Sequence, residues 1–446
     1  MRALIIIAAL AWSAPALGQM APAPPEKFDL SLAIRLRHES ITGQTRANLP
    51  ASEESTQTRA LLLATYRTRH FTIGAELIDS RAFAVPTPTA ISTNEVNALE
   101  PLQAWVAYDF GAKGKWHGRV SLGRMTLDFA SRRLLARDDY RNTLTSHTGI
   151  KLDLIAPFDL EGTFFYVLPN HRLPEDPAGI RANRIVFDEQ GFETRMWGGR
   201  LFRHRLLGRT GAEATFLRFE ERDSPIQITR DRHLSNIELR LVAPPAAGMV
   251  DFETEVIRQT GSIAPSFAPT PARLPVESWF VHGRVGYSFA GRWHGRVSVE
   301  ADYASGNRAG SASYGRFDSL FGQRRGDFAP AGLMSAILRS NLIDIGPRIE
   351  LQPAKWLDGF VEIKKMWLAS ATDGFASSGV VDATGASGRD AGWMVDGRVR
   401  LWLVPKNLRL DVEGTWIAKG RFLRTAPNRT SDADTGFLSL NLNLFL

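Results

Sequence analysis

The sequence predicts an all-β fold: a transmembrane, antiparallel, up-and-down β-barrel of about 18 strands with no plug domain. Three observations predict it. Apolar and polar residues alternate with a period of two along most of the chain, long and short joints follow one another in turn, and an export signal stands at the N-terminus. Helical periodicity is nearly absent.

The composition excludes several classes of protein. The 446 residues include no cysteine, so a disulfide framework, a thiolate zinc site and a cysteine nucleophile are ruled out. A hydrophobic fraction of 44% is too high for a disordered chain, and a mean hydropathy of −0.16 is too low for a helical membrane protein. The net charge of +7 is spread over many segments and does not indicate a nucleic-acid partner.

The first 18 residues are expected to be a cleaved signal peptide. Met1-Arg2 is a short basic start, Ala3 to Trp12 is apolar, and Ala16-Leu17-Gly18 is a small-x-small cleavage site. A membrane anchor is the alternative, but the apolar run is well short of the roughly 20 residues that a spanning helix needs. Residues 19–446 then form a single barrel domain, and about eight residues before Lys27 leave no room for a plug.

The expected strands alternate clearly. In Lys27–Glu39, apolar side chains from Phe28 to Leu36 alternate with charged or polar ones, and Trp393–Leu403 repeats the pattern. Such segments are roughly 9 to 13 residues long, enough for a tilted strand to cross a bilayer. The last segment, Gly436–Leu446, resembles the C-terminal strand that outer-membrane proteins present to the barrel-assembly machinery. Because strands in lipid must pair every backbone group, closure into a barrel is expected.

The joints between strands differ in length by position. Tight turns at Arg67–His70 and Val404–Asn407 alternate with long polar loops, of which Ala304–Arg339 is the longest. Outer-membrane barrels have short periplasmic turns and long extracellular loops, which a soluble sandwich does not need. We therefore expect the bacterial outer membrane as location, and Ala304–Arg339 as the loop that constricts or covers the pore.

Aromatic residues near the segment ends lie on the apolar parity, which faces lipid in a barrel, and should form the two interfacial girdles. They are Phe28, Tyr66, Phe71, Phe110, Tyr166, Tyr287, Phe289, Trp393 and Trp416. The polar parity faces the lumen and mixes carboxylates with many arginines, which bind planar carboxylates in a bidentate way. The alternative for any single one is an ion pair that holds the wall. The inward strand residues that we single out are Arg35, Arg37, Glu76, Arg240, Glu255, Arg284, Asp302, Lys364, Arg398 and Arg400.

Three stretches resemble the alginate-export porins. GRMTLDFASRRLLARDDYRN at Gly123–Asn142 is similar to their pattern GRQxLxYGDxRLxxxxxWxN, and GAELIDSRAF at Gly74–Phe83 resembles their E-L-x-D-S-R strand end. ADYASGN at Ala301–Asn307, followed by YGRFDSLFG at Tyr314–Gly322, resembles their Y-x-x-A-S-G-D loop. This chain departs from the patterns in having Met125-Thr126, Ala130-Ser131 and Tyr140.

The resemblance implies an 18-stranded outer-membrane barrel with a constricted, arginine-rich pore for an anionic uronate polymer. The residues in family-like positions, added to the inward set as lining the pore or binding substrate, are Arg81, Arg124, Arg132, Arg133, Arg141 and Asp318. Asp302, Arg398 and Arg400 also match. Because many carboxylates accompany these arginines, alginate itself does not follow from the resemblance.

Two function classes stay open. The first is a porin that passes anionic saccharides or other small anionic solutes, by export or uptake; the second is a structural or adhesive barrel blocked by its loops. No H-E-x-x-H or G-x-S-x-G motif is present and His282 falls on the lumen parity, so no enzyme is expected. We expect no cofactor and no metal, since Asp432 and Asp434 alone are a weak Ca²⁺ signal.

The expected partners are outer-membrane lipid and lipopolysaccharide, the barrel-assembly machinery and the anionic solute. The pairs Arg132-Arg133 and Arg324-Arg325 fall in predicted outer loops. There they would line a vestibule, bind lipopolysaccharide phosphates, or belong to a solvated loop face.

Overall fold

A computed structural model describes residues 26–112, 114–224, 228–267 and 272–446. The predicted signal peptide, residues 1–18, lies outside the described residues. Two cis peptide bonds, at Thr87-Pro88 and Leu173-Pro174, lie in long loops.

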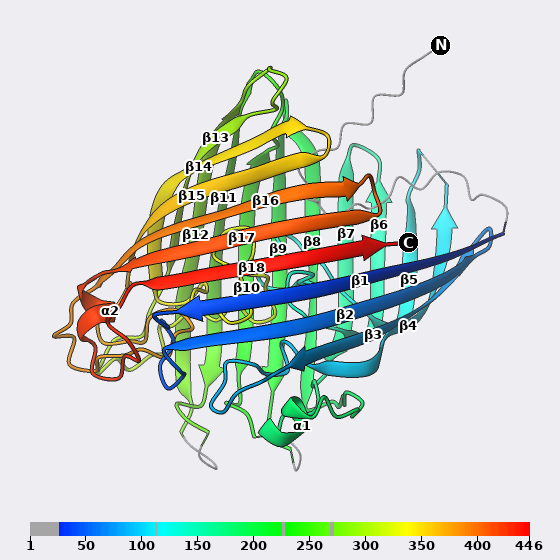
Figure 1. Cartoon of the computed structure of the whole chain (residues 1–446). Coiled ribbons are helices and arrows are strands. Elements are labelled where there is room, and N and C mark those ends of the chain that lie inside the picture. Colours follow the sequence, from blue (N-terminus) through cyan, green and yellow to red (C-terminus); the bar gives the residue numbers. More distant parts are fainter. Residues whose placement is uncertain (1–25, 113, 225–227, 268–271) are drawn as a thin grey trace.

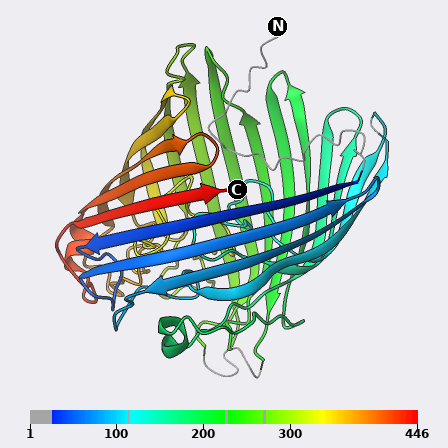
Figure 2. The same ribbon diagram turned by 45° about the vertical axis from the view of Figure 1, so that its right-hand side comes forward.

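The described residues form one 18-stranded antiparallel sheet in which β1 pairs with β18, so that the sheet closes into a barrel (Figures 1 and 2). Each other strand pairs with its neighbours in sequence. This confirms the predicted architecture. The strands are β1 Lys27–Thr42, β2 Ser52–Arg67, β3 Phe71–Phe83, β4 Asn97–Gly111, β5 His117–Met125, β6 His147–Ala156, β7 Leu160–Pro169, β8 Thr194–Leu207, β9 Thr210–Glu221, β10 His233–Ala243, β11 Met249–Ile263, β12 Leu274–Ser288, β13 Arg296–Ala304, β14 Leu342–Ala354, β15 Leu357–Trp367, β16 Asp390–Val404, β17 Leu408–Lys419 and β18 Thr435–Phe445.

The joints alternate in length as predicted. Turns such as 68–70, 157–159 and 405–407 stand at one end of the barrel, and long loops such as 170–193 and 305–341 at the other. Two short helices, α1 Pro177–Arg181 and α2 Arg421–Thr425, belong to long loops and lie at that end in Figure 1. Neither helix of the described chain is long and apolar enough to cross a membrane.

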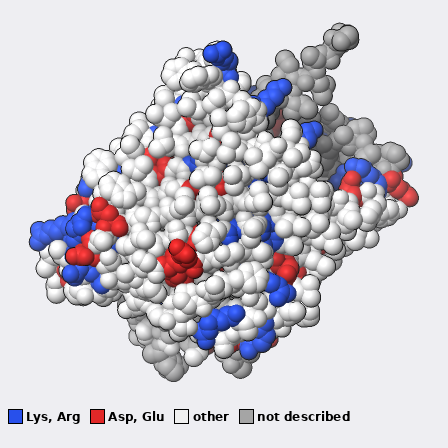
Figure 3. Space-filling view, in the orientation of Figure 1, with Lys and Arg blue, Asp and Glu red and all other residues white. Residues whose placement is uncertain are grey.

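The outer face of the wall is apolar. The parity predicted to face lipid is exposed, including Phe28, Phe71 and Trp393 among the expected girdle residues. Figure 3 shows one side of this surface, largely without charge over the strands and with charged side chains mainly toward its margins. An apolar belt of this kind needs lipid around it, which agrees with a spanning barrel.

The hydrophobic core lies inside the barrel, between the wall and inward-folded loops. It joins wall residues such as Phe219 and Phe280 with loop residues such as Leu135, Phe317 and Leu333, all at most 1% exposed. Burying a leucine contributes roughly 1.5–3 kcal/mol, so several such side chains hold a loop in place. Loop 126–146 and loop 305–341 therefore fill part of the lumen.

Candidate functional site

Loop 305–341, which the sequence predicts as the constriction, packs inside the barrel, and loop 126–146 packs against it. Their backbones form a short parallel bridge between Leu135 and Phe321. Phe321 donates its N–H to the Leu134 carbonyl at 3.0 Å, and Ala136 donates to the Phe321 carbonyl at 3.1 Å. The two loops thus form one inserted unit.

Arg133 ties this unit to the wall. Its guanidinium lies 2.8 Å from Glu253 and 2.5 Å from Glu255, both on β11, and 2.9 Å from Asp327 in the other loop. The Arg133 side chain is only 2% exposed, so these ion pairs are shielded from water. Burial would raise the pKa of Asp327, yet Arg133 and Arg339 hold it well below its usual range.

Lys364 of β15 is a second buried centre. Its Nζ lies 2.6 Å from Glu300, 3.0 Å from Asp344 and 3.5 Å from Asp302, so one ammonium faces three carboxylates. It also donates to the Asp327 carbonyl at 2.6 Å, which fixes loop 305–341 to β15. Asp302 in turn accepts from the Nδ1 of His282 at 2.8 Å.

A third group of cations holds the end of loop 126–146. Arg35 donates to the Arg141 carbonyl at 2.6 Å and Arg37 to the Tyr140 carbonyl at 2.7 Å. Arg137 pairs with Glu76 of β3 at 2.8 Å. Here the predicted wall arginines bind backbone carbonyls of this same chain.

The two loop arginine pairs are not on a solvated face. Arg325 lies 2.5 Å from Asp396 on β16 and 2.9 Å from Glu413 on β17. Arg324 donates to the Ser335 carbonyl at 2.6 Å, and burial together with repulsion by Arg141 lowers its pKa to about 9. With Arg133 also buried, lipopolysaccharide phosphates cannot reach these three groups, so that interpretation is wrong for them. The sequence predicted the inward position of loop 305–341 but not that of loop 126–146, because Arg133 meets its partners 120 or more residues away along the chain.

A cavity of about 600 Å³ lies between the inserted loops and the tight-turn end of the barrel. It reaches from Ala130–Arg133 and Gln323–Asp327 of the loops to the tight turns at Gly208 and Pro244. The described residues that line it include the carboxylates Glu161, Glu213, Asp327 and Glu350 and eleven arginines, namely Arg132, Arg133, Arg200, Arg205, Arg209, Arg240, Arg284, Arg325, Arg348, Arg398 and Arg400.

The cavity arginines differ in how they are paired. Arg240 lies 2.9 Å from Glu253 and Arg284 lies 3.0 Å from the same carboxylate. Arg400 pairs with Asp358 at 2.7 Å, and Arg132 pairs with Asp128 in its own loop at 2.8 Å. Arg398 stacks over the Phe360 ring at 5.3 Å, and no carboxylate within the described ranges forms an ion pair with it.

Of the sixteen predicted site residues, the structure brings six to the cavity: Arg132, Arg133, Arg240, Arg284, Arg398 and Arg400. Others lie in the buried networks that join the inserted loops to the wall: Arg35, Arg37, Glu76, Glu255, Asp302 and Lys364. Asp318 pairs with Arg232 at 2.7 Å and Arg141 with Asp138 at 2.6 Å, both between loop residues. Arg124 lies 2.6 Å from Glu100.

Arg81 does not join them. Along β3 the buried side chains are Thr72, Glu76, Ile78 and Ser80, whereas Arg81 falls on the other parity and lies 3.0 Å from Asp79. This places it with the outward-facing residues, which corrects the expectation taken from the family motif. Counting the strand parity from Phe71 would have shown it.

The cavity also contains arginines that the sequence analysis did not single out. Arg200 and Arg205 come from β8, where glycines and arginines obscure the alternation, and Arg209 is in a turn. For loop 126–146 a signal was present: Leu134-Leu135-Ala136 is an apolar run inside a predicted outer loop, and all three residues are buried.

Comparison with known proteins places this architecture. A family model described as alginate export matches residues 26–437. Among curated proteins, none matches the chain by sequence.

Solved structures of outer-membrane proteins from Pseudomonas aeruginosa share the fold. OpdQ superposes with a TM-score of 0.58 at 12% identity, covering 94% of this chain and 97% of that chain. OccK2 (OpdF) gives 0.59 at 11% identity over 94% and 98%, and its complex with glucuronate gives 0.56 at 11% over 94% and 96%. The architecture and its setting in the bacterial outer membrane agree with the sequence predictions.

Proposed function

The chain belongs to the alginate-export family and is an outer-membrane channel protein; we propose that it passes anionic saccharides or other small anionic solutes along the arginines of its lumen. The surrounding outer-membrane lipid and lipopolysaccharide would cover the apolar belt. In this proposal β18 is the segment read by the barrel-assembly machinery.

The observation that carries the proposal is the charge of the cavity. Eleven arginines against four carboxylates line a space of about 600 Å³, a volume within the usual range for a small-molecule site. Nine of these arginines form ion pairs with carboxylates in the lining or behind it, whereas no carboxylate of the described residues forms an ion pair with Arg209 or Arg398. These two guanidinium groups would attract an anion. Arg398 is the best placed to bind it, since it stacks on Phe360 and no carboxylate of the described residues would have to be released.

The spread of the guanidinium groups over the cavity favours passage of a solute over its retention at one place. They come from β8, β10, β12, β14 and β16 and from both inserted loops, so a carboxylate can exchange one arginine for the next. Weak binding at several sites is what conduction requires. One fold neighbour was crystallised with glucuronate, an anionic sugar, and the same chemistry suits this cavity. We propose no catalytic step.

The test is the reversal potential of the refolded protein in a planar bilayer under a salt gradient, repeated with an oligouronate on one side. The proposal expects anion-selective current that the uronate blocks. Cation-selective current, indifferent to the uronate, would mean that the lumenal carboxylates dominate and would overturn it. Opposite-side addition of the uronate tests export against uptake.

A second candidate is a structural or adhesive barrel without transport. The observation in its favour is that loops 126–146 and 305–341 are packed into the lumen and tied there by buried ion pairs. This candidate predicts no conductance even after loop 305–341 is shortened. A channel predicts larger conductance from the shortened variant.

A further inference from the structure

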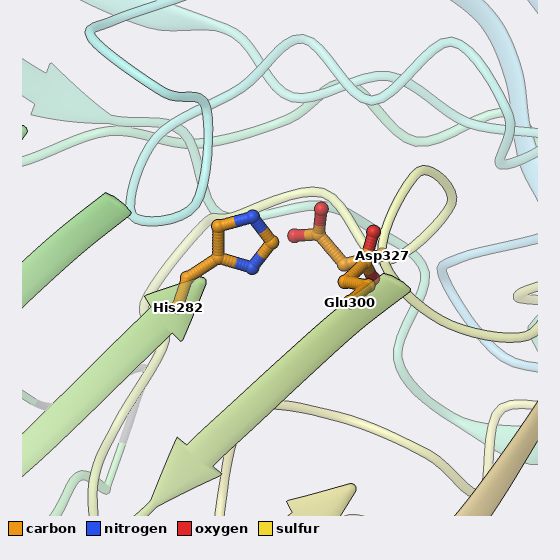
Figure 4. A group of neighbouring side chains, drawn as sticks. All are labelled: His282, Glu300 and Asp327. Carbon is orange, nitrogen blue, oxygen red and sulfur yellow. The ribbon is translucent and has the colours of Figure 1, made fainter. Parts of the chain in front are cut away.

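Three side chains from separate elements face one another inside the barrel wall (Figure 4). His282 lies on β12, Glu300 on β13 and Asp327 in loop 305–341. One nitrogen of the histidine and one oxygen of each carboxylate lie within 4.8 Å of one another, and all three residues are buried. No metal was expected from the sequence, where Asp432 and Asp434 alone are a weak Ca²⁺ signal. His282, Glu300 and Asp327 are too far apart along the chain to form a local motif.

The imidazole is held in the form that binds a metal. Its Nδ1 is 2.8 Å from Asp302, and a carboxylate there fixes the tautomer with the proton on Nδ1. The Nε2 lone pair is then free, and this atom is buried without a hydrogen-bond partner among the described residues. His282 is 0% exposed, so the ring is shielded from bulk solvent. Glu300 Oε2 is a second buried oxygen without a hydrogen-bond partner in the same part of the chain.

The local charge also favours a cation. Lys364 faces three carboxylates, Glu300, Asp302 and Asp344, and Arg284 lies opposite Glu300 on the neighbouring strand. Arg133 and Arg339 bind Asp327, and Arg133 also balances the two β11 glutamates. Since each carboxylate oxygen can accept more than one partner, Asp327 keeps a place for a metal bond.

We infer that His282, Glu300 and Asp327 form a site for a divalent first-row transition metal ion, best suited to Zn²⁺. Zinc binds both imidazole nitrogen and carboxylate oxygen, whereas Mg²⁺ and Ca²⁺ prefer oxygen alone. The ligand atoms would draw together by about 1 Å on binding, because zinc bonds are about 2.0–2.2 Å long. The ion would clip loop 305–341 to β12 and β13. This inference is independent of the proposed solute.

The experiment is calorimetric titration of ZnCl₂ into the metal-stripped, refolded full-length protein at pH 7. We expect one Zn²⁺ per chain, lost in His282→Gln and Glu300→Gln. Asp302→Asn, which removes the carboxylate that orients the imidazole, should weaken binding by roughly 10–100-fold. His147→Gln is the matched control: His147 is also 0% exposed with both ring nitrogens unpartnered among described residues, and its variant should bind like the wild type.

Wild-type protein that binds no Zn²⁺ would overturn the inference, and so would binding that every variant retains. If His282→Gln does not fold, X-ray absorption at the zinc edge of the loaded wild type decides. One imidazole with oxygen ligands at about 2.0–2.1 Å supports the site. A shell of oxygen alone contradicts it.

Discussion

Two parts of the lumen use the same residue types for different purposes: the part around the inserted loops, and the cavity between these loops and the tight turns. Around the inserted loops, Arg133 and Lys364 each face two or three buried carboxylates. In the lining of the cavity, arginines outnumber carboxylates. Buried, fully paired charges fix loops in position, whereas Arg398, which no carboxylate of the described residues pairs with, is available to a solute. The residue type alone does not distinguish the two roles; the partners do.

The largest expected effect on stability comes from breaking the ion-pair network around Arg133. Arg133→Ala removes the shared partner of Glu253, Glu255 and Asp327. Glu253 and Asp327 keep other arginines, but buried Glu255 keeps only a distant ion pair at 3.9 Å. The free energy of unfolding should fall by about 3–5 kcal/mol, measured by urea titration.

The neighbouring residue supplies the control. Among the described residues Arg132 forms one ion pair, with Asp128 in its own loop, and the two side chains are 18% and 33% exposed. Arg132→Ala should therefore cost less than about 1 kcal/mol. Equal losses in the two variants would contradict the division of roles.

Acid should release loop 305–341. Burial would raise the pKa values of Asp327 and Asp318, but Arg133 and Arg339 beside the first and Arg232 beside the second lower both below the usual value. A depressed carboxyl pKa stabilises the folded state above about pH 4, and that contribution is lost as pH falls through the lower folded pKa.

Pepsin tests this, because it works across that range. Loop 305–341 should resist cleavage at pH 4 and become susceptible near pH 2. The exposed loop around Phe187 and Phe192 should be cut at both values. Cleavage of loop 305–341 already at pH 4 would mean that the ion pairs do not hold it.

A smaller effect tests the contact between the two loops. At Gly322 an added Cβ would collide with the Arg133 carbonyl oxygen. Gly322→Ala should cost roughly 1–3 kcal/mol, as other overpacked sites do. Gly374→Ala, where the nearest atom to an added Cβ is 3.5 Å away, is the control and should change stability little. Urea titration of both variants makes the comparison.

The barrel itself was predictable because its signals are local. Period-two alternation shows each strand, and the register shows which side faces the lumen, as for Arg240, Arg284 and Arg398. The loop positions were not predictable in the same way. Arg133 meets Asp327 across 194 residues of sequence, and nothing near either residue indicates that they form a pair.

The smallest effect on stability is expected at an exposed ion pair between β11 and β12. Arg258 and Glu277 form an ion pair at 3.2 Å with side chains 50% and 58% exposed. Because water screens such a pair, Arg258→Ala should change the free energy of unfolding by less than about 1 kcal/mol. A loss as large as that of Arg133→Ala would show that burial does not set the strength of these pairs.

The central claim is that the arginines that line the cavity, Arg398 above all, select anions. The most direct test compares reversal potentials of the wild type, the double variant Arg398→Glu/Arg400→Glu, and Arg81→Glu, in a planar bilayer under a salt gradient. Arg81 lies on the outward parity of β3, so its reversal changes the same kind of charge outside the cavity. We predict anion selectivity in the wild type and in Arg81→Glu, and reduced or inverted selectivity in the double variant. Unchanged selectivity in the double variant would contradict the claim.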